Sequence, residues 1–135
     1  MLGQWKKVLF ILIIGAILYA GCNSQMMLKT EEIFRTQNPN LSLTPKVCYL
    51  LGNVAYLTFR YQLAIDIIKR NLKDFPYASG AEDAEYRLAV CYEKLGNYTE
   101  AISLYENFLL DHPQSERYQS TENKVSKLKA LHQPM

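Results

Sequence analysis

The cysteines and histidines are the first candidates for nucleophiles, bases or metal ligands, and the 135-residue sequence has five of them: Cys22, Cys48, Cys91, His112 and His132. They form no Cys-x-x-Cys pair and no His-Glu-x-x-His motif, and no Gly-rich phosphate loop accompanies them. No histidine lies near a cysteine in the sequence, so no nucleophile is paired with a base. These patterns predict a protein that is not an enzyme and that uses no metal ion, cofactor or small-molecule substrate.

Cys22 differs from the other cysteines because it follows a basic start and an unbroken apolar run. Lys6 and Lys7 precede the 13 apolar residues Val8–Ala20, and Gly21 stands directly before Cys22. A helix of this length spans about 20 Å, which is short of the ~30 Å hydrocarbon core of a bilayer. A basic start, a short apolar stretch and small residues after it are typical of a secretory signal.

The junction at Gly21-Cys22 resembles the bacterial lipoprotein signal, although Tyr19 stands where that signal usually has Leu. The resemblance implies that residues 1–21 are a cleaved signal peptide and that Cys22 becomes the acylated N-terminus. A thiolate is the nucleophile that accepts lipid, and more than one acyl chain is needed for stable anchoring. Because no Asp follows Cys22, the resemblance places the protein at the outer membrane, facing the periplasm. The alternative is an uncleaved anchor helix over residues 8–20.

The charge of the chain argues against nucleic acid as a partner. The formal net charge is +2, and outside Lys6 and Lys7 the 13 remaining basic residues balance the 13 acidic ones. Nucleic-acid affinity depends mainly on cationic neutralisation of phosphates, which a neutral body does not provide. An apolar content of 49% with 21% charged residues is typical of a folded globular chain.

The sequence repeats itself with an offset of 37 residues. Residues 46–76 have eight identical counterparts in the second copy, including Tyr61 with Tyr98, Ala64 with Ala101 and Pro76 with Pro113. A period of this length indicates a stacked array of small units. Apolar residues recur at intervals of three and four in each copy, so each unit is predicted to contain two helices.

The second copy is similar to the tetratricopeptide repeat, and the residues that match its signature are Leu88, Ala89, Tyr92, Gly96, Tyr98, Ala101, Tyr105 and Pro113. The first copy departs from the signature at Phe59, where a turn glycine is expected, and at Asn71, where a small apolar residue is expected. The resemblance covers residues 45–115 and implies an all-α array of two repeats, 45–76 and 82–113.

Two flanking segments complete the predicted organisation. Residues 22–44 are predicted to be the lipidated N-terminus and a linker, with a short amphipathic helix at Met26–Arg35 whose apolar residues are Met27, Ile33 and Phe34. Residues 116–135 are predicted to form a capping helix and a tail, because a terminal unit otherwise leaves an apolar face bare. The apolar stripe of that helix comprises Tyr118, Thr121, Val125, Leu128 and Leu131.

Cys48 and Cys91 lie within apolar helical stretches at non-equivalent places of the two copies. A disulfide requires Cα atoms within about 7 Å of each other. The sequence therefore predicts two buried free thiols rather than a bridge.

The family resemblance also implies a groove that binds extended peptides or partner helices, lined by Tyr49, Asn53, Tyr56, Tyr86, Val90 and Glu93. Tyrosine suits such a surface because it offers a broad apolar face and a polar tip. The alternative is that the Met26–Arg35 segment folds over this face and buries it. The first helix, at Lys46–Leu57, is apolar on nearly all sides, which indicates burial on more than one side. We expect a second copy of the chain or a partner to cover it rather than the Met26–Arg35 segment, because residues 37–45 are predicted to be a flexible spacer.

The lipoprotein start and the repeats together are similar to BamD-type outer-membrane assembly lipoproteins and to the tetratricopeptide domain of the Tol–Pal coordinator. This resemblance implies a lipid-anchored envelope scaffold that binds protein partners, as a homo-oligomer or within a larger envelope complex. Assembly or stabilisation of an outer-membrane, secretion or pilus complex is the implied role. The alternative is a small structural membrane subunit that keeps its N-terminal anchor helix.

Overall fold

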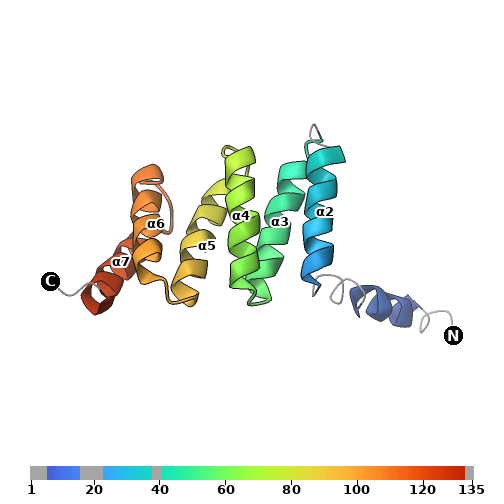
Figure 1. Ribbon diagram of the computed structural model, residues 1–135, viewed down its shortest axis with the longest axis horizontal. Coiled ribbons are helices and arrows are strands. Elements are labelled where there is room, and N and C mark those ends of the chain that lie inside the picture. Colours follow the sequence, from blue (N-terminus) through green and yellow to red (C-terminus); the bar gives the residue numbers. More distant parts are fainter. Residues whose placement is uncertain (1–5, 16–22, 38–40, 133–135) are drawn as a thin grey trace.

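The computed structural model describes residues 6–15, 23–37 and 41–132, and all regular structure in these ranges is helical. Residues 6–15 are helical, and the helices that follow are α2 (Ser24–Gln37), α3 (Thr44–Leu57), α4 (Tyr61–Asp74), α5 (Ala81–Lys94), α6 (Tyr98–Asp111) and α7 (Tyr118–His132). From α2 to α7 they stand side by side in chain order, and each packs against the next (Figure 1). The predicted all-α repeat array is confirmed.

The 37-residue period extends beyond the two copies detected in the sequence. Helices α2, α4 and α6 begin at residues 24, 61 and 98, and helices α3, α5 and α7 begin at residues 44, 81 and 118. The buried positions keep the same period, since Met27, Ala64 and Ala101 are all buried at equivalent places. Helix α2 therefore takes the position of the second helix of a preceding unit, and α7 that of the first helix of a following unit.

The core runs as two adjoining clusters along the stack. One contains Met27 and the buried isoleucines of α4, and the other contains Ala101, Tyr105 and the buried face of α7. Cys48 and Cys91 are both free and fully buried, which confirms the prediction of two unbridged thiols. Burial raises the pKa of the Cys91 thiol to about 11 and also raises that of Cys48, so both are held in the unreactive thiol form.

Helix α2 packs on α3, so the expectation that a second copy or a partner covers this side of α3 is wrong. The helix is longer than predicted, and its buried side chains are Met27 and Glu31. Ile33, which we placed on the apolar stripe, is 47% exposed, and Phe34 is only half-buried. The pattern of apolar residues alone did not predict this contact, because its central buried residue is the carboxylate of Glu31.

Helix α7 packs against α6, in the place predicted for the capping helix. Its buried residues are Thr121, Val125 and Leu128, which occupy the places of Ala84, Leu88 and Cys91 in α5. Leu131, the last residue of the predicted stripe, is instead 62% exposed.

The turn between α3 and α4 contains a residue with unfavourable backbone geometry. Phe59 has φ +60°, and Gly96, one period later, has φ +78° in the equivalent turn. The left-handed conformation costs a side chain with a Cβ atom roughly 1–2 kcal/mol, a cost that glycine avoids. The Phe59 ring is 77% exposed and meets the Tyr61 ring edge-on, with the ring centroids 6.3 Å apart.

Replacing Phe59 by Gly is expected to raise the free energy of unfolding by about 1 kcal/mol, because glycine adopts φ > 0 without strain. Urea denaturation followed by circular dichroism measures this change. Phe59→Ala is the matched control, since it removes the same ring but keeps the strained Cβ, and it is expected to give no gain. A lower urea midpoint for Phe59→Gly than for Phe59→Ala would contradict the assignment of strain to this turn.

Candidate functional site

One face of the array is formed by the first helices α3, α5 and α7, and its side chains link across all three units. The Arg87 guanidinium lies 5.5 Å from the centre of the Tyr56 ring and pairs with Asp83 at 2.8 Å. Asp83 also pairs at 2.8 Å with Arg117, whose guanidinium lies 5.2 Å from the centre of the Tyr86 ring. Cations over tyrosine faces hold both groups in fixed orientations. We call this surface the first-helix face.

A second polar cluster closes the same face near the other end of α5. The Tyr105 hydroxyl donates a 2.6 Å hydrogen bond to Glu93, and Lys124 approaches the same carboxylate at 3.1 Å. Burial of Glu93 would raise its pKa, but these two donors outweigh burial and hold the pKa below its usual value. Burial raises the pKa of the Tyr105 hydroxyl, with the Glu93 carboxylate adding to the rise. The carboxylate thus fixes α5 against α6 and α7.

Two of the six predicted groove residues lie in the core. Tyr49 and Val90 are only 5% and 6% exposed. The Tyr49 hydroxyl donates a 2.9 Å hydrogen bond to the Phe75 carbonyl, and burial raises its pKa to about 12. Their burial in this structure is a correction to the predicted groove, because these side chains pack the array instead of lining its surface.

The other four predicted residues, Asn53, Tyr56, Tyr86 and Glu93, remain partly exposed on α3 and α5. Tyr86 packs against the rings of Tyr105 and Phe108 at centroid distances of 5.7 and 5.6 Å, so one side of its ring belongs to the core. Arg87 brings the α3 and α5 members together through its contact with Tyr56. Whether a partner contacts these four residues stays a prediction.

A stripe of exposed leucines on the first-helix face was missed from the sequence. Leu43, directly before α3, and Leu50 and Leu57, on α3, are 52%, 59% and 66% exposed and are spaced seven residues apart. Side chains seven residues apart lie on the same side of a helix. Leu50 occupies the place that Arg87 has in α5 and Lys124 has in α7. The sequence showed that this helix is apolar on nearly all sides, but it did not indicate which side remains exposed to solvent.

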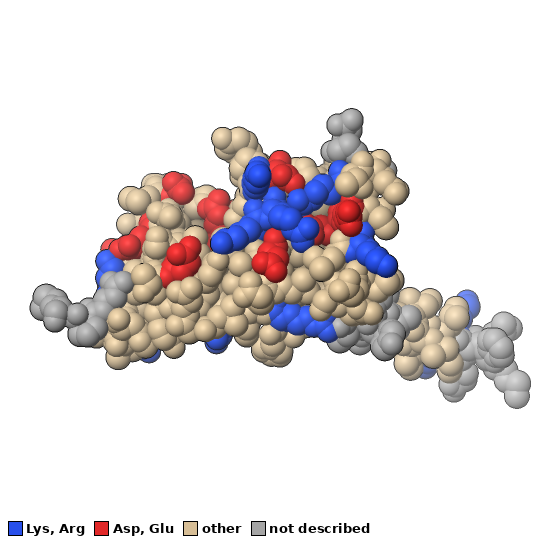
Figure 2. Space-filling view, in the orientation of Figure 1, with Lys and Arg blue, Asp and Glu red and all other residues tan. Residues whose placement is uncertain are grey.

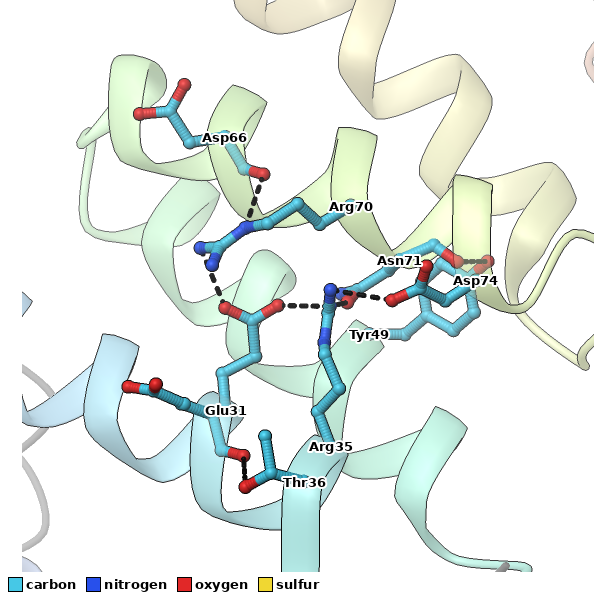
Figure 3. Close-up of polar contacts among 9 residues, drawn as sticks. Glu31, Arg35, Thr36, Tyr49, Asp66, Arg70, Asn71 and Asp74 are labelled. Atoms are coloured by element: carbon cyan, nitrogen blue, oxygen red, sulfur yellow. Dashed lines mark hydrogen bonds and ion pairs between the residues drawn. The ribbon is translucent and has the colours of Figure 1, made fainter. Parts of the chain in front are cut away.

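The contact between α2 and α4 is ionic, and Figure 3 shows its members. Glu31 is completely buried, with Arg35 and Arg70 at 2.5 and 2.8 Å from its two carboxylate oxygens. Arg35 also donates a 2.7 Å hydrogen bond to Asn71 Oδ1 and pairs with Asp74 at 2.7 Å. Burial raises the pKa of Glu31, and Arg70 and Arg35 oppose the rise. We call this cluster the α2 ionic joint.

The joint explains why Asn71 departs from the repeat signature. One period later, Arg35 and Asn71 are replaced by Leu72 and Phe108, which line one small pocket between α4 and α6. The same position is therefore polar where α4 meets α2 and apolar where α6 meets α4. A small apolar residue at position 71 would leave the Arg35 guanidinium without this acceptor.

Charge is also unevenly distributed over α4 and α6, the second helices of the two units. Basic side chains gather over the middle of the view, where α4 carries the exposed Lys69, Arg70 and Lys73, and acidic ones lie toward α6 (Figure 2). Such a solvated charged surface contrasts with the leucine stripe of α3.

The histidines hold structural positions in the described part of the chain. His112 Nε2 lies 2.5 Å from Glu85, and the His132 ring stacks on Tyr98 with the centroids 3.6 Å apart. Residues 6–15, 23–37 and 41–132 contain no group of three His, Cys, Asp or Glu side chains placed to hold a metal ion. Cys22 and most of the proposed cleavage region lie outside the described residues.

Residues 83–115, which span nearly all of α5 and α6, match the tetratricopeptide repeat family. The match gives α5 and α6 together the character of one tetratricopeptide-like unit. Tetratricopeptide repeats generally mediate protein–protein interaction, and the helical scaffold they build is typically not enzymatic. A search of the curated proteins found no match to the chain.

Replacing Arg35 by Met is expected to cost roughly 2–4 kcal/mol of stability, because it leaves Glu31 buried with one cation and Asn71 without its donor. The loss is expected to appear first as faster amide hydrogen exchange in α2. Arg87→Met is the matched control, since Arg35 and Arg87 both pair at i,i+4 and are 22% and 24% exposed, but the Asp83 partner is 29% exposed. That variant is expected to cost about 1 kcal/mol or less. Equal costs for the two variants would contradict the role of the α2 ionic joint.

Proposed function

We propose that the protein is a membrane-tethered adaptor of the cell envelope that binds a protein partner across its first-helix face. The observation that carries this proposal is the exposed stripe of Leu43, directly before α3, and Leu50 and Leu57, on α3. A contiguous apolar patch on a folded surface marks an interaction site more often than isolated apolar residues do. The resemblance to tetratricopeptide arrays implies that the first helices bind the partner, and the stripe follows one of these helices, α3.

The partner chemistry that fits this face best is an amphipathic helix. Leucines seven residues apart match apolar side chains that repeat at the same interval on a facing helix. Tyr56 on α3 and Tyr86 on α5 have partly exposed rings, and Arg87 and Arg117, which both pair with Asp83, lie over them. These aromatic and arginine groups are of the types that dominate binding energy at interfaces. Because the ion pairs already fix them, little further ordering is required on binding.

The proposed tether is the N-terminal segment. Residues 6–15 form a helix whose large apolar side chains from Val8 to Ile14 are each at least 41% exposed. Such a surface supports placement in a membrane or in the export machinery rather than against the array. Acylation of Cys22, outer-membrane location and a periplasm-facing array are the proposal that follows from the lipoprotein-like junction. Within the described ranges, no helix combines the length and the apolar character that crossing a membrane requires.

The resemblance to envelope assembly lipoproteins supports a role in building or stabilising an outer-membrane, secretion or pilus complex. The second candidate function, a small structural membrane subunit with an uncleaved anchor, is favoured by the same exposed helix at residues 6–15. The two differ in covalent structure, so mass measurement separates them.

Introducing lysines at Leu43 and Leu50 is expected to abolish partner binding without loss of stability, because both side chains are already more than half exposed. The measurement is co-purification from the native envelope in mild detergent, comparing bands retained by the wild-type chain and by Leu43→Lys/Leu50→Lys. Leu110→Lys is the matched control, since Leu110 is a 78% exposed leucine on α6, outside the first-helix face. Retention of the same partners by the double variant would show that the leucine stripe is not the binding site.

Replacing Cys22 by Ser is expected to leave an uncleaved and unacylated precursor, because the thiolate that accepts lipid is lost. Intact mass spectrometry of the membrane fraction measures this outcome. The wild-type chain should lack residues 1–21 and carry added acyl mass. A wild-type mass that retains residues 1–21 would favour the uncleaved anchor instead.

A further inference from the structure

Phe59 combines a large exposed aromatic ring with a strained backbone, and contacts within the chain account for neither. Its φ of +60° is the one left-handed backbone conformation at a non-glycine residue in the described ranges. Strained backbone conformations of this kind cluster at functional sites. The ring is 77% exposed, so its packing within the chain does little to offset the strain.

Other exposed apolar side chains lie at the same end of the stack. Leu57 ends α3 at 66% exposure, and Leu95, in the equivalent turn after α5, is 48% exposed. The α3–α4 and α5–α6 turns are both on the lower edge in Figure 1, where α2 also begins. Arg60 and Lys94 carry positive charge at these two turns, and Glu100, in the first turn of α6, carries one negative charge beside them. We call this surface the turn edge.

A direct contact places the turn edge beside the N-terminal segment. Arg60 Nη1 donates a 3.2 Å hydrogen bond to Ser24 Oγ, the first residue of α2. Ser24 follows Cys22 by two residues, which span at most about 7 Å of extended chain. A lipid attached at Cys22, or an anchor helix that ends there, is therefore joined by a short stretch of chain to the end of α2 that contacts the α3–α4 turn.

We propose that the turn edge contacts the phospholipid surface and that Phe59 inserts its ring among the headgroups. This inference rests on the proposed membrane tether. An aromatic ring and leucines gain by leaving water at the apolar boundary of a bilayer, and nearby cations are attracted to anionic headgroups. Glycine, which the next repeat uses at this turn, provides no such group. The array is therefore held upright on the membrane by two points, the N-terminal tether and the Phe59 ring.

The test uses the full chain reconstituted in phosphatidylethanolamine–phosphatidylglycerol vesicles, with Trp5 replaced by Phe so that one introduced tryptophan reports. Phe59→Trp places the probe on the turn edge. Tyr77→Trp is the matched control, since Tyr77 is a 99% exposed aromatic residue in the α4–α5 loop at the opposite end of the stack. Fluorescence quenching by acyl-brominated lipid reports insertion, and quenching by aqueous iodide reports exposure to water.

The expected result is at least twofold stronger quenching by brominated lipid for the Phe59→Trp chain than for the Tyr77→Trp chain, and the reverse order for iodide. Leu57→Trp, at a helical position without backbone strain, gives a second reading in case the Phe59→Trp chain does not fold. Equal iodide quenching of the turn-edge probe and the control probe, in chains that float with the vesicles, overturns the inference and leaves the tether standing. A chain that does not float with the vesicles removes the tether and, with it, this inference.

Discussion

Each inner helix of this array, from α3 to α6, packs between its two neighbours along the stack. The stack therefore holds together through contacts between successive helices, as in other repeat proteins. Because each unit repeats after 37 residues, side chains at equivalent positions of α3, α5 and α7 fall in line. This alignment brings Arg87 to Tyr56 and Arg117 to Asp83. The first-helix face is a consequence of the regular stacking and would be lost with it.

The joint between α2 and α4 differs from the others in kind. Elsewhere the buried clusters are apolar, with ion pairs such as Lys124–Glu93 at their edges. Here a fully buried carboxylate is matched by two arginines, and one of these also bonds to an amide. Apolar surfaces tolerate small shifts, whereas a slip of one turn in α2 would carry Glu31 away from Arg70 and would carry Arg35 away from Asn71 and Asp74. The ionic contact therefore fixes the register of α2 on the stack.

The sequence predicts the helices of the second unit well because local signals agree there. Asn97 accepts the Glu100 amide at 3.4 Å, and Gly96 adopts the left-handed turn. The sequence comparison did not detect that α2 and α7 follow the 37-residue period. Their residues occupy equivalent positions to those of the other helices but are of different types. Glu31, Ile68 and Tyr105 share one buried position, yet their chemistry has nothing in common.

The candidate site was predicted only in part for a related reason. A periodic pattern identifies which residues lie on the first helices, but exposure depends on small rotations that neighbouring helices set. Tyr49 and Val90 therefore point into the core, while Leu50 points outward. The departures at Asn71 and Phe59 were visible in the sequence. Neither departure could be explained without the position of α2. Asn71 accepts a hydrogen bond from Arg35 of α2, and Phe59 lies in the turn whose Arg60 contacts Ser24 of α2.

The ionic joint also determines how the array responds to mechanical load. Tension applied through the N-terminal segment enters the folded body at Ser24 and passes along α2 before it reaches any other helix. The bonds that tie α2 to α4 are short, directional contacts from Arg70 to Glu31 and from Arg35 to Asp74 and Asn71, and they fail after a displacement of about an ångström or two. Apolar contacts between the later helices yield more gradually. Under tension, α2 should therefore detach abruptly from the array before any other helix, while the first-helix face remains folded.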